Sequence, residues 1–178
     1  MLRSGAGCSP AFYSWHRAVA AGLTFRPVTQ ADLPFLAQVY ASTRREELAL
    51  TSWSEAEKAG FLDMQFRAQH AHYQQHYTTA DFLAILRKGE PIGRLYLDRW
   101  AREHRVVDIA LLPEHRGQGL GTAVMRDLLE EAETAGKSLS IHVEKFNPAQ
   151  RLYERLGLVR VGETGAYDLM RWEPPQES

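Results

Sequence analysis

The spacing of apolar residues in the first half of the chain predicts one strand and two helices. Apolar residues alternate over 23–27, which is typical of a short strand. Two segments that follow capping boxes at Thr29 and Ser54 repeat their apolar residues every three or four positions, so each is predicted to be a helix. Residues 43–53, between these helices, carry an Arg-Arg-Glu-Glu run, and their pattern fits either a helix or a loop.

In the second half of the chain the apolar period shortens, and strands become the main prediction. Residues 82–86 and 92–100 flank a Lys-Gly-Glu-Pro turn, so we expect them to form a hairpin. Further strands are predicted over 106–112, 138–143, 159–161 and 167–172, and helices over 119–135 and 148–156. This order of elements predicts a mixed α/β fold with both hairpin and crossover connections.

Composition and charge describe a globular chain without a bulk attraction to polyanions. The 178 residues are 44% hydrophobic and 24% charged, which provides a core and a length suited to one domain. The 21 basic and 22 acidic residues leave a net charge of −1, so we expect neither nucleic acid nor a membrane as a partner. The single cysteine, Cys8, excludes an internal disulfide and a cysteine-rich zinc site, and it fits a cytoplasmic protein.

The two ends of the chain differ in composition from the segment between them. We expect residues 1–22 to be a flexible leader, 23–173 to be a single domain and 174–178 to be a polar tail. Residues 18–21 also resemble the small-residue end of a signal peptide. Polar residues within 14–17 interrupt the apolar region that a signal peptide needs, so we favour the leader.

The most informative segment is a glycine-rich turn over residues 111–122, between a predicted strand and a predicted helix. The first turn of a helix leaves backbone N–H groups unpaired at the positive end of the helix dipole, and glycines let a ligand approach them. The turn therefore suits a phosphate or pyrophosphate. It is not a Walker loop, because no Lys-Ser or Lys-Thr pair closes the glycine spacing, and it departs from the dinucleotide fingerprint at Thr122.

Two motifs resemble those of the GNAT superfamily of N-acetyltransferases. Arg116, Gly119 and Gly121 match the Arg/Gln-x-x-Gly-x-Gly/Ala loop that binds the pyrophosphate of acyl-coenzyme A in that family. Residues 147–158 are similar to the family's Asn-x-x-Ala-x-x-x-Tyr-x-x-x-Gly-Phe helix, with Leu158 in place of the usual Phe. The resemblance implies an α+β fold with a mixed, mostly antiparallel central sheet of about seven strands and about four flanking helices.

The resemblance also implies that acetyl-CoA is the co-substrate. Its pantetheine arm would lie where the fourth and fifth strands splay apart, beside backbone groups of Leu111 and Leu112, and the Leu111 N–H would polarise the thioester carbonyl. Asn147 would cap the following helix or bond to the pantetheine amide. The loop residues expected to bind the pyrophosphate are Arg116, Gly117, Gln118, Gly119, Leu120, Gly121 and Thr122. The alternative is that the glycines only allow the helix and strand to pack closely.

Tyr153 is predicted to donate the proton that the leaving thiolate of CoA requires. A phenol with an ordinary pKa of about 10 can supply that proton, and the alternative is a tyrosine packed in the core. The attacking amine must also lose a proton, either to water or to one of four carboxylates, Asp108, Glu144, Glu46 or Glu47. The sequence does not rank these acids, since each could be an ordinary surface carboxylate.

Two histidines stand at a spacing that metal ligands use. His72 and His76 lie four residues apart on a predicted helix. No glutamate or third ligand occupies the corresponding motif positions, so we predict that both are surface residues and that the protein uses no metal.

Together these patterns predict an acetyl-CoA-dependent N-acetyltransferase that acts on a primary amine by direct attack in a ternary complex. Cys8 lies in the predicted leader and gives no support to a covalent acyl-enzyme. The acceptor would be a small molecule or a peptide, contacted by residues 43–53 and 163–166, and a homodimer is an open alternative. Three other functions stay open: the same fold with another acyl-CoA, a non-catalytic CoA-binding module, and a nucleotide-binding domain of dehydrogenase type.

Overall fold

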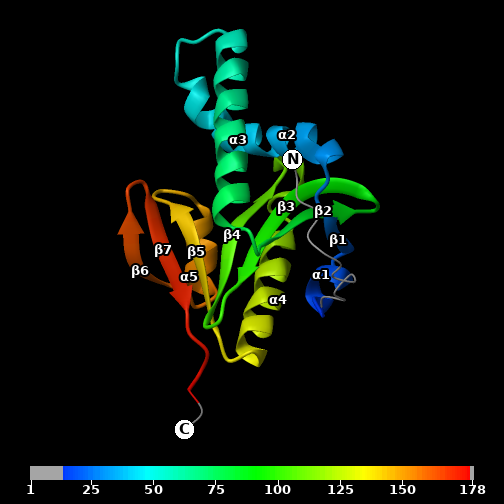
Figure 1. Cartoon of the computed structure of the whole chain (residues 1–178), viewed down its shortest axis with the longest axis vertical. Helices are drawn as coiled ribbons and strands as arrows, with labels where there is room; N and C mark the ends of the chain where they lie inside the picture. The colour runs from blue at the N-terminus through cyan, green and yellow to red at the C-terminus, as the bar shows by residue number, and fades with distance from the viewer. Residues whose placement is uncertain (1–13, 177–178) are drawn as a thin grey trace.

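A central twisted sheet runs through the computed structural model, which describes residues 14–176 (Figure 1). Its strands are β1 (Leu23–Pro27), β2 (Asp81–Arg87), β3 (Glu90–Arg99), β4 (Glu103–Leu111), β5 (Ser138–Glu144), β6 (Val159–Thr164) and β7 (Tyr167–Trp172). The seven strands lie in the order β1-β2-β3-β4-β5-β7-β6. Only β4 and β5 pair in parallel, and all other neighbours are antiparallel. The mixed, mostly antiparallel sheet is therefore confirmed.

Capping boxes precede the helical segments that begin at Gln30 and Glu55. The helices are α1 (His16–Ala20), α2 (Leu33–Ala49), α3 (Glu55–His76), α4 (Leu120–Thr134) and α5 (Ala149–Arg155), with 3-10 turns at Gln30–Asp32 and Pro113–His115. Ahead of α3, the Glu57 carboxylate accepts the Ser54 N–H at 2.7 Å and the Ser54 hydroxyl accepts the Glu57 N–H at 3.2 Å, so this capping box is confirmed. The segment left open at 43–53 continues α2 as far as Ala49 and is irregular beyond it.

The helices cover both faces of the sheet. The main core lies between the sheet and α4, and it also takes up apolar residues of α1 and α5. A smaller core of Leu36, Tyr40 and Phe66 joins α2 to α3 on the other face. The first half of α3 projects beyond the sheet (Figure 1), which leaves Met64 59% exposed. Among the described residues, none of the helices combines the length and hydropathy that crossing a bilayer would require.

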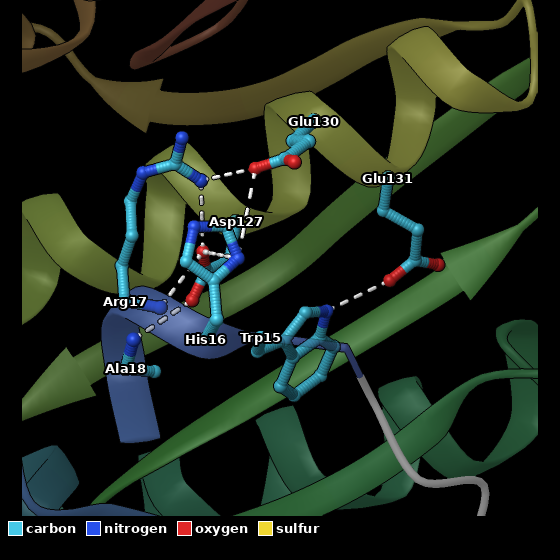
Figure 2. Close-up of polar contacts among 7 residues, drawn as sticks. All are labelled: Trp15, His16, Arg17, Ala18, Asp127, Glu130 and Glu131. Carbon is cyan, nitrogen blue, oxygen red and sulfur yellow. Dashed lines mark hydrogen bonds and ion pairs between the residues drawn. The ribbon is translucent and has the colours of Figure 1, made fainter. Parts of the chain in front are cut away.

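The prediction that the domain begins at residue 23 was wrong. The part of the expected leader that the structure describes, residues 14–22, forms α1 and packs into the main core, where Trp15 is 1% exposed and Ala18 is 0% exposed. Figure 2 shows the Trp15 indole N–H donating to Glu131 of α4, at 2.8 Å. Residues 1–13 of the expected leader lie outside the described residues, as does Cys8.

A buried carboxylate attaches α1 to α4. Asp127 is 2% exposed, and one of its oxygens accepts the Ala18 N–H at 2.8 Å. The other oxygen accepts the backbone N–H of Arg17 at 3.2 Å and its guanidinium at 3.1 Å (Figure 2). No local pattern in the sequence indicates this attachment, because a helix of five residues shows no apolar period and its acidic partner lies 110 residues away.

We expect Asp127→Ala to lower the free energy of unfolding by about 2–4 kcal/mol, because it leaves the backbone N–H groups of Arg17 and Ala18 without their acceptor. Urea unfolding measures the loss. Glu133→Ala, which removes an exposed carboxylate from the same helix, is the control and is expected to change stability by less than about 0.5 kcal/mol. Equal effects of the two substitutions would show that Asp127 does not attach α1.

Candidate functional site

The sheet opens between β4 and β5. These strands pair only over 103–106 of β4 and 138–141 of β5. Beyond these positions β4 stays paired with β3 as far as Leu111, while β5 stays paired with β7 as far as Glu144. Residues 107–111 and 142–144 therefore diverge, and we call the opening between them the splay. Its existence agrees with what the family resemblance implied.

A β-bulge lies where the splay begins. In the pairing of β3 with β4, Leu97 opposes Val106 but Tyr96 opposes Asp108, so Val107 is an extra residue on β4. A bulge bends its strand and increases the local twist. It also turns the Asp108 side chain toward α3, because Asp108 now shares a face with its partner Tyr96, whose ring contacts Tyr73 of α3.

The backbone of β4 leaves hydrogen-bonding groups free on the side of the splay. The Leu112 N–H donates to the Ile92 carbonyl of β3 at 2.8 Å, and the Leu112 carbonyl accepts the His115 N–H at 3.0 Å. Because N–H groups of an antiparallel pair alternate in direction, those of Ile109 and Leu111 face away from β3 and into the splay. The Leu112 N–H is therefore already committed to β3, whereas the N–H groups of Ile109 and Leu111 remain available on the side of the splay.

The glycine loop at the end of β4 has an open outer surface. Gly117 and Gly119 have φ values of 69° and 78°, in the left-handed region that favours glycine. A Cβ at Gly117, Gly119 or Gly121 would meet no atom within 4 Å, so close packing of helix and strand does not explain these glycines. Three N–H groups, those of Leu120, Gly121 and Thr122, lie in the first turn of α4 without an intrahelical partner. This arrangement can bind an anion.

The polar side chains of the loop hold its shape. The Arg116 guanidinium donates to the Leu111 carbonyl at 2.9 Å and to the Ser42 hydroxyl of α2 at 3.2 Å. The Gln118 side-chain oxygen accepts from Arg87 of β2 at 2.7 Å. Arg116 thus ties the loop to the open end of β4, while Gln118 ties it to the end of β2, on the far side of β3. Both side chains are exposed at their outer ends and could also meet a bound anion.

Tyr153 enters the splay from the α4 face of the sheet. It lies on α5 within the main core and is 5% exposed. Its hydroxyl makes no hydrogen bond to another described residue. The hydroxyl oxygen is not fully buried, so a ligand can reach it. Burial, together with the negative charge of Asp108, raises the pKa of Tyr153 well above its usual value, so the phenol stays protonated. The ring of Tyr153 therefore packs in the core, as in the alternative interpretation of this residue. Its hydroxyl nevertheless remains accessible.

Asp108 approaches the splay from the opposite face, within a buried polar cluster. One carboxylate oxygen accepts from the Arg94 guanidinium at 2.8 Å and from the Tyr73 hydroxyl at 3.2 Å. Arg94 is 2% exposed and also donates to Gln69 of α3 at 3.0 Å. Burial first, and the charge of Asp108 second, raise the pKa of Tyr73. Since Asp108 influences both Tyr153 and Tyr73, residues from the two faces of the sheet meet at the splay.

The other candidate bases lie farther along or outside this cluster. Glu144 ends β5 and forms an ion pair with Arg44 of α2. Glu47 is exposed and accepts from the same arginine at 3.2 Å, and Glu46 is exposed on α2. Asp108 thus lies close enough for its charge to raise the pKa of Tyr153, while Glu144 lies at the open end of β5 with its charge balanced by Arg44.

Asn147 caps α5, which is one of the two roles expected of it. Its side-chain oxygen accepts the Ala149 N–H at 2.9 Å, and its own N–H donates to the Glu144 carbonyl at 3.0 Å. The side chain is exposed. The helix that carries Tyr153 is thereby attached directly to the end of β5.

Sequence reasoning missed four residues at the splay: Ile109, Tyr73, Arg94 and His142. Arg94 and His142 could have been found, since each is a titratable residue whose immediate neighbours in its strand are non-polar. The other two gave no local signal. The direction of the Ile109 N–H depends on strand pairing, and the position of Tyr73 depends on how α3 crosses the sheet.

Known proteins match this chain both in sequence and in fold. Residues 44–158 match the Acetyltransferase (GNAT) family, a range that includes the glycine loop and α5. A Bacillus subtilis (strain 168) protein, provisionally named ribosomal protein bS18-alanine N-acetyltransferase, is 31% identical over 108 residues. That match covers 58% of this chain and 70% of the relative.

Solved structures share the fold at low sequence identity. The PaiA N-acetyltransferase of Thermoplasma acidophilum, solved in complex with coenzyme A, has a TM-score of 0.64 and 16% identity, and the match covers 85% of this chain and 98% of that one. An acetyltransferase of Thermus thermophilus has a TM-score of 0.57 and 22% identity, with 85% and 96% of the two chains covered.

We expect Gly93→Ala to destabilise the protein by about 1–3 kcal/mol, because its Cβ would lie 2.3 Å from the Ala110 carbonyl oxygen and press on the β4 segment that borders the splay. Gly60→Ala is the matched control. Gly60 is on α3 with no atom within 4 Å of an added Cβ, so this change is expected to stabilise by about 0.5–1 kcal/mol. Thermal or urea unfolding compares the two, and a neutral Gly93→Ala would contradict the tight approach of β3 to β4.

Proposed function

The chain belongs to the Acetyltransferase (GNAT) family, and from this premise we propose that it transfers an acetyl group from acetyl-CoA to a primary amine by direct attack in a ternary complex. The observation that carries the proposal is the splay with an open glycine loop at its end. The alternatives that keep the same fold, another acyl-CoA or binding without catalysis, have no specific observation in their favour.

The residues around the splay fit the shape and charge of acetyl-CoA. The free N–H groups at the start of α4 would bind the pyrophosphate, and the free edge of β4 would bind an extended pantetheine arm like an added strand. The bound molecule supplies an activated acetyl thioester. Since the arm enters from the loop, beside Leu111, the thioester would lie farther along β4. We therefore assign the N–H that stabilises the oxyanion to Ile109, in place of Leu111.

Tyr153 would supply a proton to the departing thiolate. Its hydroxyl is open while its ring is packed, so it is held in one place and remains able to meet a reacting atom. Its raised pKa keeps the proton on the phenol until negative charge develops beside it. Cap and core contacts of α5, including the Asn147 cap, set the position of this hydroxyl.

Asp108 is the stronger candidate for the group that receives the amine's proton. Its charge raises the pKa of Tyr153, which supports a position near the proposed proton donor, whereas Glu144 does not affect that pKa and lies at the end of β5. Arg94 and Tyr73 occupy only one oxygen of Asp108. Among the residues that the structure describes, the second oxygen has no hydrogen-bond partner, so it can attract an ammonium group and take its proton directly or through water.

A peptide amine is the acceptor that we favour. The relative from Bacillus subtilis is provisionally named for an alanine of a ribosomal protein, which supports a protein or peptide acceptor for this chain. A small-molecule amine is the competing acceptor, and an assay of CoA release with both classes decides between them.

The pyrophosphate site is tested by Gly121→Asp. Gly121 has room for a side chain, and an acid in the first turn of a helix does not oppose the helix dipole, so the free protein should keep its melting temperature. The new carboxylate should repel the pyrophosphate and weaken CoA binding at least about tenfold by calorimetry. Gly121→Asn, the neutral control of equal size, should bind more tightly than Gly121→Asp. Equal affinities of the two variants would place the pyrophosphate elsewhere.

The proton donor is tested by Tyr153→Phe. The loss of the hydroxyl is expected to lower kcat about 100-fold or more while the affinity for acetyl-CoA changes little, because the ring keeps its core contacts. Tyr77→Phe, at the residue that directly follows α3, is the control. Thiol release with a panel of amines measures turnover. An unchanged kcat would remove Tyr153 from the proposed chemistry, and CoA binding without any turnover in the wild type would favour a non-catalytic module.

A further inference from the structure

His142 lies at the narrow end of the splay. Pairing of β5 with β4 ends at Ile141, so His142 is the first residue of β5 past the last paired position. Side chains alternate along a strand, and Ile141 and Val143 point into the main core. His142 therefore points to the opposite face, the one on which α3 and Asp108 lie. Its ring is half-buried.

An arginine with no freedom to turn lies against this ring. Arg105 of β4 is 8% exposed, and its Nε donates to the Ser140 hydroxyl at 2.7 Å. Its Nη2 donates to Glu103 at 3.1 Å, and Arg171 of β7 holds the other oxygen of Glu103 at 2.9 Å. The Trp100 ring lies 4.8 Å from the guanidinium carbon and covers one side of its plane. Nε and Nη2 thus each have a partner, and the edge at Nη1 remains.

The remaining edge determines which nitrogen of His142 carries the proton. Arg105 Nη1 lies 3.2 Å from His142 Nδ1. A guanidinium can donate a hydrogen bond but cannot accept one, so Nδ1 must present its lone pair. In the neutral ring the proton is then on Nε2. Among the described residues, Nε2 has no hydrogen-bond partner, and it is not fully buried, so this N–H is accessible to a ligand.

The charged groups around the ring keep it neutral. Burial, and after it the positive charge of Arg105, lower the pKa of His142, while Glu103 acts in the opposite direction. Arg171 lies on the neighbouring strand, and the Glu144–Arg44 pair lies next along the same face of β5. Protonation of Nδ1 would also place its proton against the Arg105 N–H. A neutral ring with its only lone pair facing Arg105 cannot serve as a base.

We propose that His142 Nε2–H binds an oxygen of the acceptor, next to the reacting amine, and that Arg105 positions it as a donor. The proposal rests on the proposed function. Asp108 offers a carboxylate oxygen to an ammonium group on the same face, and His142 offers a neutral N–H to an oxygen. This pair of groups fits an α-amino carbonyl compound, such as a peptide N-terminus or an amino-acid amide. A simple alkylamine satisfies only Asp108.

The tautomer is tested without reference to activity, by 15N NMR of the His142 ring in the full-length protein. We expect a single neutral form with the proton on Nε2 at pH 7. Arg105→Leu should release this preference and give a mixture of tautomers. A wild-type ring that is charged at pH 7, or that carries its proton on Nδ1, would overturn the proposal.

The ligand is tested in the CoA-bound protein with alaninamide, and with isopropylamine, which lacks the carboxamide. Alaninamide should shift the Nε2–H resonance of His142, whereas isopropylamine should not. Equal responses to the two amines, or no response to alaninamide, would overturn the assignment of the oxygen. Failure of the protein to bind CoA at all would instead count against the proposed function, and the tautomer result would stand separately.

Substitutions separate a donor from a base. With alaninamide, His142→Ala should lower kcat/KM about 5- to 15-fold, as expected for one lost hydrogen bond. His142→Gln, which keeps an N–H donor, should recover most of that loss, while His142→Glu should not. Recovery by Glu together with no recovery by Gln would show that His142 acts as a base.

Discussion

The structure depends on the separation of β4 from β5. Unpaired backbone groups inside a sheet are costly, and two parallel strands that have begun to pair would normally continue. Here each strand has a stronger partner on its other side: β3 holds β4 along its length, and β7 holds β5. The bulge at Val107 bends β4 at the last paired position and keeps the strands apart. The free edge of β4 is therefore a consequence of the strand pairing and of the bulge.

Charge pairs surround this opening and account for its polar character. Asp108 is held by Arg94, Glu144 by Arg44, and Glu103 by both Arg105 and Arg171. Buried ion pairs of this kind add little net stability, because desolvation offsets most of their attraction. Their effect is to hold side chains in fixed orientations. Within residues 14–176, one oxygen of Asp108, the Tyr153 hydroxyl and His142 Nε2 have no hydrogen-bond partner, and each lies on a different element.

The part of the domain that packs on the α4 side of the sheet begins before residue 23, where the composition of the sequence placed the start of the domain. Trp15 packs edge-on against Phe25 at 4.7 Å between ring centres, and Asp127 holds the backbone of α1. This face supports α4, whose first turn carries the proposed pyrophosphate site, and it supports α5, which carries Tyr153. The anchored N-terminal segment is thus part of the scaffold behind the site.

The sequence by itself determined whatever depends on near neighbours in the chain. The Ser54–Glu57 capping box, the apolar period of α4 and the glycine loop each lie within a few residues, and all were predicted. Tertiary structure alone decided which groups of the site are free. Arg17 meets Asp127 across 110 positions and Arg105 meets His142 across 37. Whether the Leu112 or the Ile109 N–H faces the splay depends on strand register, since alternation reverses with a shift of one residue. No local pattern records such a register, because pairing and the bulge set it only when the strands assemble.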